Sequence, residues 1–138
     1  MQKIVLFFFV FFLSVNPGYS VVIEGVHPEY AGKEIFFYKF SDPVSLNKDF
    51  VFKIMFDKNG KFKTSVDVPK NLFVFSNFGI YEGMLFLEPE KDLQLVFPPL
   101  REKSCAEEKN PFFKPVQFWI NTKNKTDLTS RISSFDQY

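Results

Sequence analysis

The sequence predicts an all-β protein, an antiparallel β-sandwich of about seven strands with a short C-terminal helix. Short stretches of alternating apolar and polar residues recur along the chain, separated by turn residues at the spacing of about 8–12 residues typical of sandwiches. The chain holds 21 phenylalanines, 16 of them beyond residue 20, and aromatic residues favour half-buried pleated surfaces. Asn59-Gly60, between two such stretches, is a strong signal for a tight turn.

Residues 1–20 are predicted to be a signal peptide. Lys3 precedes an apolar run over residues 4–15, and Gly18-Tyr19-Ser20 supplies the small residues that a signal peptidase recognises. The run is short for a membrane span, and a retained anchor is the alternative. Cleavage after Ser20 would leave 16 basic and 16 acidic side chains, a balance that argues against a nucleic-acid partner. We expect an exported protein, without a stable membrane span after cleavage.

Residues 21–99 are expected to form the sandwich domain. Its first strands are predicted over residues 21–26, 33–40, 49–57, 62–68 and 72–78. Because Asn-Gly supplies the positive φ values of a tight hairpin turn, the third and fourth of these strands should pair directly with each other. Most connections are short, which favours antiparallel neighbours.

The stretch from Gly79 to Pro99 is the predicted centre of the fold. Residues 81–87 read as an apolar strand, and Pro89 interrupts the pattern because it has no N–H to donate to a sheet. A second strand follows over residues 92–97, with alternate apolar residues on one face. The pattern predicts a hairpin whose polar tip contains Glu88 and Glu90, both exposed to water.

Residues 100–138 differ from the domain before them and are expected to form a loop, a short strand within residues 116–121 and a C-terminal helix. The single cysteine, Cys105, lies among charged residues, so we expect an exposed loop thiol that cannot form an internal disulfide. Thr126 is the expected N-cap of a helix from Asp127 onward. Leu128, Ile132 and Phe135 then form an apolar stripe.

No pattern in the sequence predicts catalysis, a cofactor or a metal site. Glu88, Glu90 and Asp92 are close in sequence, but nothing around them supplies the burial that separates the pKa values of a catalytic pair. His27 is the only histidine and has no nearby cluster of ligands. We therefore expect a non-enzymatic protein.

An aromatic set offers a different reading, a platform that binds a glycan or a peptide. Its members are Phe36, Tyr38, Phe40, Phe112, Phe113 and Trp119. Most of these rings are expected in the core, because a small sandwich needs large residues to fill it. Trp119 or Tyr81 in a concave patch would favour the glycan or peptide reading.

Several short motifs resemble one family in their order along the chain. They are Val22-Ile23-Glu24-Gly25, Tyr30-Ala31-Gly32, Asp57-x-x-Gly60-x-Phe62, Gly79-x-Tyr81, Leu87-Glu88-Pro89, Phe97-Pro98-Pro99, Asn110-Pro111-Phe112-Phe113 and Ile132-x-x-Phe135-Asp136-x-x-Tyr138. Together they resemble the N-terminal region of exported thioredoxin-like proteins of Gram-negative bacteria, of the thiol–disulfide oxidoreductase type. The resemblance implies a transthyretin-like, that is immunoglobulin-like, sandwich followed by a helical linker and a thioredoxin domain.

The chain departs from that family in two respects. Glu90 stands where such proteins usually have glycine, and no Cys-x-x-Cys occurs, so the family's redox activity does not carry over. The resemblance implies an accessory module of the periplasm or cell envelope with a thioredoxin-like partner. Trp119, Leu128, Ile132 and Phe135 are the candidate contact residues. If that partner normally covers the helix stripe, the stripe should be partly exposed.

Overall fold

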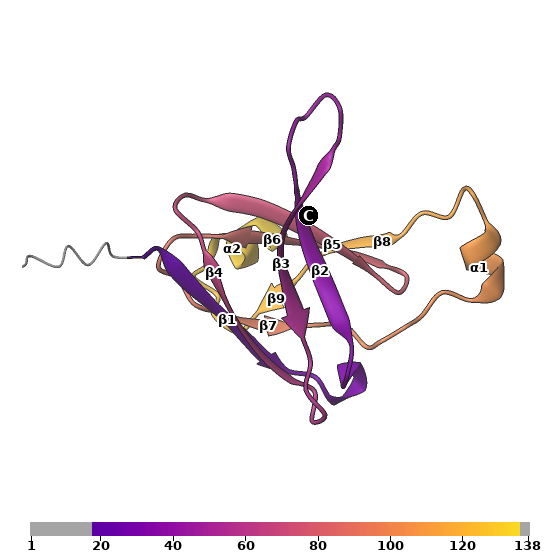
Figure 1. The fold of residues 1–138 in the computed structure, drawn as a ribbon, viewed down its shortest axis with the longest axis horizontal. Coiled ribbons are helices and arrows are strands. Elements are labelled where there is room, and N and C mark those ends of the chain that lie inside the picture. The colour runs from indigo at the N-terminus through magenta and orange to yellow at the C-terminus, as the bar shows by residue number, and fades with distance from the viewer. Residues whose placement is uncertain (1–17, 136–138) are drawn as a thin grey trace, which may run out of the picture.

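The computed structural model describes residues 18–135, which form nine strands and three short helices (Figure 1). The strands are β1 (Ser20–Val26), β2 (Glu34–Phe40), β3 (Lys48–Met55), β4 (Lys61–Asp67), β5 (Leu72–Phe78), β6 (Tyr81–Leu87), β7 (Leu93–Val96), β8 (Val116–Trp119) and β9 (Asn121–Thr122). The helices are the 3-10 helix η1 (Pro28–Tyr30), α1 (Cys105–Lys109) and α2 (Leu128–Ser133). Apart from its last three residues, the predicted signal peptide lies outside the described residues.

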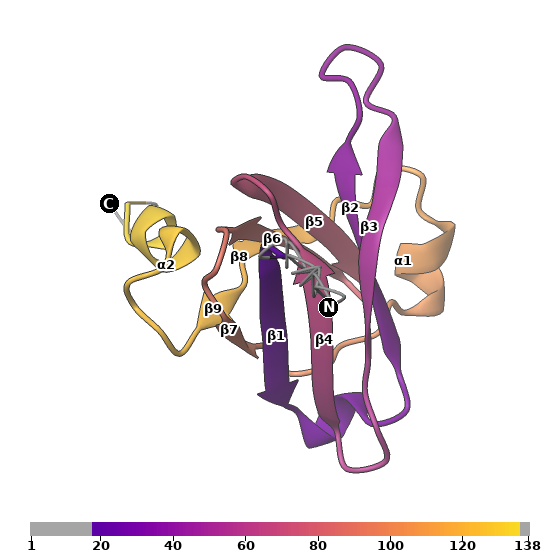
Figure 2. The same ribbon diagram turned by 60° about the vertical axis from the view of Figure 1, so that its left-hand side comes forward.

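The strands form two sheets around one core, so the expectation of a β-rich, sandwich-like protein with a short C-terminal helix is confirmed. The four-stranded sheet has the order β4-β1-β7-β9 and the five-stranded sheet the order β3-β2-β5-β6-β8. Figure 2 shows β1 and β4 side by side, with α2 at one edge of the molecule. Two expectations were wrong: the described residues form nine strands rather than about seven, and the pairs β1–β7 and β6–β8 are parallel.

Both predicted hairpins are also wrong. β3 pairs with β2 and β4 pairs with β1, so the Asn59-Gly60 turn carries the chain from one sheet to the other. In the same way β6 pairs with β5 and β8, whereas β7 pairs with β1 and β9. A strand that bends into the facing sheet keeps the same inward-facing apolar alternation as a strand that folds back beside its neighbour. Periodicity therefore could not distinguish these corners from hairpins.

The inward faces of both sheets meet in one apolar core. Ile23 and Leu95 from the four-stranded sheet face Phe37, Ile54 and Leu85 from the five-stranded sheet, and all five are at least nine-tenths buried. The stacked pair Phe37 and Phe52 has ring centroids 4.6 Å apart. A core of this kind gives the sheets a fixed frame on which their outer faces can present side chains.

The chain after Pro99 supplies an edge strand to each sheet. β8 extends the five-stranded sheet beside β6, and β9 extends the four-stranded sheet beside β7. Cys105 is exposed, as expected, but it begins α1 rather than lying in a loop. The N-cap of α2 is Asp127 rather than Thr126, since the Asp127 carboxylate accepts a hydrogen bond from the Ser130 N–H.

Tyr30 joins the η1 segment to the strand end at Pro98. Its ring is buried in an aromatic cluster with Phe56 and Phe97, and its hydroxyl donates a 2.8 Å hydrogen bond to the Pro98 carbonyl. Burial, reinforced by the nearby Tyr81 and acidic side chains, raises the pKa of the Tyr30 phenol far above its ordinary value. The folded protein therefore strongly favours the protonated phenol.

Tyr30→Phe should cost about 1 kcal/mol near neutral pH, because one hydrogen bond is lost. The native pKa is raised, so the contribution of Tyr30 is fully present below the unfolded pKa of about 10 and is lost as pH rises above it. The stability advantage of wild type over Tyr30→Phe should therefore fall by about 1.4 kcal/mol per pH unit above about pH 10, so that it disappears within about one pH unit and then reverses sign. Urea unfolding at a series of pH values measures this advantage, and an advantage independent of pH would contradict the assignment.

Glu90, in the turn between β6 and β7, adopts a φ of +62°. A non-glycine residue in this left-handed region is strained by about 1–2 kcal/mol, and glycine removes that strain. Part of the gain is offset, because glycine also makes the unfolded chain more flexible. Glu90→Gly should therefore stabilise the protein by about 0.5–1 kcal/mol in denaturant unfolding. Glu90→Ala, which keeps the Cβ atom, is the control and should bring no such gain.

Candidate docking surface

The outer face of the five-stranded sheet carries one apolar residue from every strand in a continuous row. Phe50 of β3 lies opposite Tyr38 of β2, and Tyr38 lies opposite Phe75 of β5. Phe75 lies opposite Met84 of β6, and Met84 lies opposite Trp119 of β8. In β2, β5, β6 and β8 a core residue stands next to the row residue along the strand, so the row faces away from the core. Phe50 joins the row because the pairing of β2 with β3 shifts its register between Phe37 and Tyr38.

Further rings beside this row complete a surface that we call the aromatic platform. Its members are Phe36, Tyr38, Phe40, Phe50, Phe73, Phe75, Met84, Phe86 and Trp119. Phe40 stacks on Phe75 with centroids 4.5 Å apart, and Phe86 stacks on Trp119 at 5.5 Å. Phe73 lies 6.5 Å from Phe75 and 5.2 Å from Phe86. Ring contacts therefore run without a break from β3 to β8.

The platform is most open along the β2–β3 hairpin. Phe50 is 56 % exposed and Phe40 is 42 % exposed, whereas neighbouring side chains cover Phe75 and leave it only 3 % exposed. The Lys48 ammonium lies 5.1 Å from the Phe75 ring centre, a cation–π contact. Soluble proteins seldom leave so continuous an apolar face without a partner, which makes this face the leading candidate for docking.

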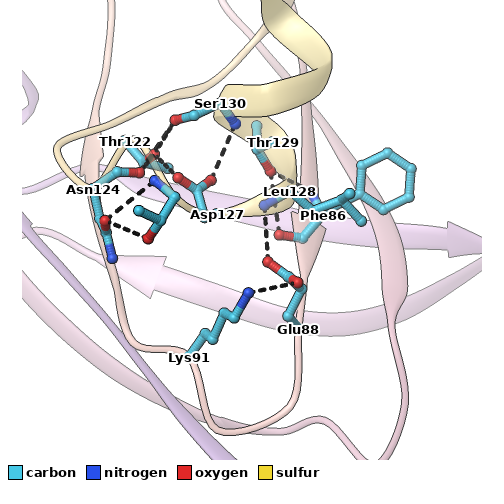
Figure 3. A network of polar contacts seen from close by, with 10 residues as sticks. Phe86, Glu88, Lys91, Thr122, Asn124, Asp127, Leu128, Thr129 and Ser130 are labelled. Carbon is cyan, nitrogen blue, oxygen red and sulfur yellow. Dashed lines mark hydrogen bonds and ion pairs between the residues drawn. The ribbon is translucent and has the colours of Figure 1, made fainter.

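The helix α2 is fixed to the edge of β6 beside the platform (Figure 3). The Thr129 hydroxyl accepts a 2.9 Å hydrogen bond from the Phe86 N–H and donates a 3.2 Å hydrogen bond to the Phe86 carbonyl. Thr129 is almost fully buried. The pairing of β6 with β8 ends at Met84, so β8 does not reach the backbone of Phe86. The Thr129 hydroxyl takes its place and pairs both the N–H and the carbonyl of Phe86.

Two carboxylates, those of Asp127 and Glu88, hold the start of α2 (Figure 3). Together with Thr129 they form a network that we call the helix clamp. Buried Asp127 accepts hydrogen bonds from the Thr122 hydroxyl at 2.6 Å and from the Ser130 N–H at 3.2 Å. Glu88 accepts a 2.8 Å bond from the Leu128 N–H and pairs with Lys91 at 2.9 Å. Glu88 was expected to be exposed, but its side chain is only 17 % exposed because it serves α2.

The four residues predicted as contacts lie on two neighbouring features. Trp119 belongs to the platform, as just described. Leu128 and Ile132 lie on α2 and are half-buried, and Phe135, just after the helix, is 77 % exposed. Because α2 contacts β6 and β8, its apolar residues lie near the Phe86–Trp119 end of the platform.

Sequence reasoning found only part of the platform. Phe36, Tyr38, Phe40 and Trp119 were in the predicted aromatic set, but most of that set was expected in the core, and these four lie on the outer face. Phe112 and Phe113 lie apart from them, and Phe113 contacts Lys103 instead. The strand register adds the missed members, which are Phe50, Phe73, Phe75, Met84 and Phe86. The signal for four of them, all but Phe50, was an apolar pattern on both faces of the fifth and sixth strands.

Comparisons with models of protein families, with curated proteins and with solved structures find no match to this chain. Within residues 18–135, no three potential ligand side chains come together in a way that could hold a metal ion. Over the same residues no helix is both long and apolar enough to cross a membrane.

Proposed function

We propose that the chain is a non-enzymatic, exported docking module with a transthyretin-like or immunoglobulin-like sandwich, and that its aromatic platform binds a partner protein. The observation that carries the proposal is the apolar row that crosses all five strands from Phe50 to Trp119. A thioredoxin-like domain of the bacterial envelope is the partner that the sequence resemblance implies.

The chemistry of the platform favours a protein over a polar ligand. Seven of its nine members are Phe or Met, whose side chains offer apolar contact area but no hydrogen-bond donor. Aromatic residues and Met are also the types enriched in the buried centre of protein interfaces. The partner should therefore present an apolar patch of its own.

The helix clamp supports a second contact beside the first. It fixes α2 on β6, so Leu128 and Ile132 are carried on a rigid element next to the platform, and Phe135 follows just after its end. A contact on ordered elements costs less conformational entropy on binding than one on a flexible tail. We propose that the partner covers both the platform and this stripe.

Calorimetric titration of the chain with a purified envelope thioredoxin-like domain tests the proposal. Wild type should bind, and Phe50→Asp should weaken binding at least about tenfold, since a charge would be buried in the interface. Val26→Asp is the matched control, because Val26 is 55 % exposed at the end of β1, in the other sheet, and should leave binding unchanged. Absence of binding by wild type, or equal binding by Phe50→Asp, would overturn the proposal.

A second candidate function is that of an autonomous module for a glycan or a peptide. The observation that favours it is the near-parallel stack of Phe86 and Trp119, with 14° between the planes, close to the hydrogen-bonded pair Gln117 and Glu82. Flat rings beside polar groups suit the apolar face and the hydroxyls of a sugar. Quenching of Trp119 fluorescence by a neutral oligosaccharide, with no binding of the thioredoxin-like domain, would favour this candidate.

A further inference from the structure

The outer face of the four-stranded sheet carries a polar row, in contrast to the apolar row on the other sheet. Lys63 of β4 lies opposite Glu24 of β1, and Glu24 lies opposite Gln94 of β7. The Gln94 carbonyl accepts a 3.0 Å bond from the Lys123 N–H, just beyond β9. Four polar residues thus cross the sheet from one edge to the other.

A groove follows this row on the surface. One part, of about 570 Å³, is lined by Val22, Glu24, Lys63, Asp92, Leu93, Gln94, Lys123 and Asn124. An adjoining part of about 350 Å³ shares Glu24, Lys63, Gln94 and Lys123 and extends to Val26 and Lys61. The shared lining makes the two parts one elongated depression above β1. Its size suits a short, extended polar chain.

The acids of the groove already have polar partners, whereas two of its lysines form no ion pair within the described part of the chain. Glu24 accepts a 3.1 Å hydrogen bond from Gln94 and lies 3.9 Å from the Lys63 ammonium. Asp92 accepts a 2.8 Å bond from the Val22 N–H. Lys61 and Lys123 form no ion pair among residues 18–135. They lie on the β4 and β9 sides of the groove, so its rims carry cations that are free to meet an anion.

We propose that this groove binds an acidic saccharide, a chain of sugar units that carry carboxylates. The ligand carboxylates would pair with Lys61 and Lys123, and its hydroxyls would donate to the remaining lone pairs of Glu24 and Asp92. The amides of Gln94 and Asn124 add groups that both donate and accept. An acidic peptide fits less well, because it offers one backbone N–H per residue, whereas each sugar unit offers several hydroxyls that can both donate and accept.

Titration with a defined probe tests this site independently of the platform. Wild type should bind a galacturonic acid pentamer at low salt and should not bind the neutral maltopentaose. Lys61→Gln combined with Lys123→Gln should weaken binding of the pentamer at least about tenfold, or 1.4 kcal/mol. Lys70→Gln is the matched control, since Lys70 is exposed but lines neither part of the groove.

Each other outcome overturns the proposal. These outcomes are no binding of the pentamer, equal binding of maltopentaose, equal loss with Lys70→Gln, and full binding by the double variant. A glutamate pentamer that binds as tightly as the sugar would show that the groove selects charge rather than a saccharide. Phe50→Asp should leave sugar binding intact, because Phe50 is in the other sheet, so this site and the docking surface can fail separately.

Discussion

Thr129→Val should destabilise the protein by about 2–4 kcal/mol, because the N–H and the carbonyl of Phe86 both lose the part-buried hydroxyl that pairs them. Valine has nearly the shape of threonine, so the change removes the hydroxyl and little else. Urea unfolding measures the loss. Because the same hydroxyl fixes α2, trypsin cleavage at Arg131 should also become faster in the variant under native conditions.

Thr129→Ser is the matched control for this prediction. It keeps the hydroxyl and removes one methyl group, so it should cost only about 1 kcal/mol and leave Arg131 protected. If the valine and serine variants were equally stable, the hydrogen bonds to Phe86 would not be what holds α2. The clamp would then depend on Asp127 and Glu88 instead.

Gly60→Ala should cost about 3 kcal/mol or more, for two reasons that add. Gly60 has a φ of +74°, in the region where a side chain is strained. A Cβ atom there would also lie 2.2 Å from the His27 carbonyl oxygen, so the backbone would have to move. That movement would disturb the 2.6 Å hydrogen bond from the His27 N–H to the Gly60 carbonyl, which joins this turn to the end of β1.

Lys58→Ala, in the same turn, is the control for Gly60→Ala. Lys58 is exposed and its side chain forms no ion pair within the described part of the chain, so the change should alter stability by less than about 0.5 kcal/mol. Thermal unfolding of the two variants separates the cases. A loss below about 1 kcal/mol for Gly60→Ala would mean that the turn adapts and is not a fixed corner between the sheets.

The fold class was predictable because it depends on local patterns. The alternating residues of β3 and β4 and the turn at Asn59-Gly60 were read correctly as strand, turn and strand. Which strand pairs with which depends on contacts between distant residues, such as Ile23 with Thr64 and with Leu93. No local signal carries that information, which is why the corners were taken for hairpins.

The platform was only partly predictable for a related reason. Phe73 and Phe75 look like ordinary core residues, because a strand with apolar residues on both faces usually has both faces covered. Only the register shows that they share an outer face with Tyr38 and Met84. The clamp was harder still, since Thr129 and Phe86 are 43 residues apart and neither residue is unusual in its local sequence.

Hydroxyl-radical footprinting tests most directly whether the aromatic platform is the docking surface. The chain would be oxidised alone and in the presence of the thioredoxin-like domain, and modification would be read at each residue. We predict that Phe50, Met84 and Trp119 become strongly protected in the mixture, while Phe112, which is 85 % exposed and lies apart from the platform, does not. Unchanged modification of all three platform residues in a mixture that forms the complex would contradict the account.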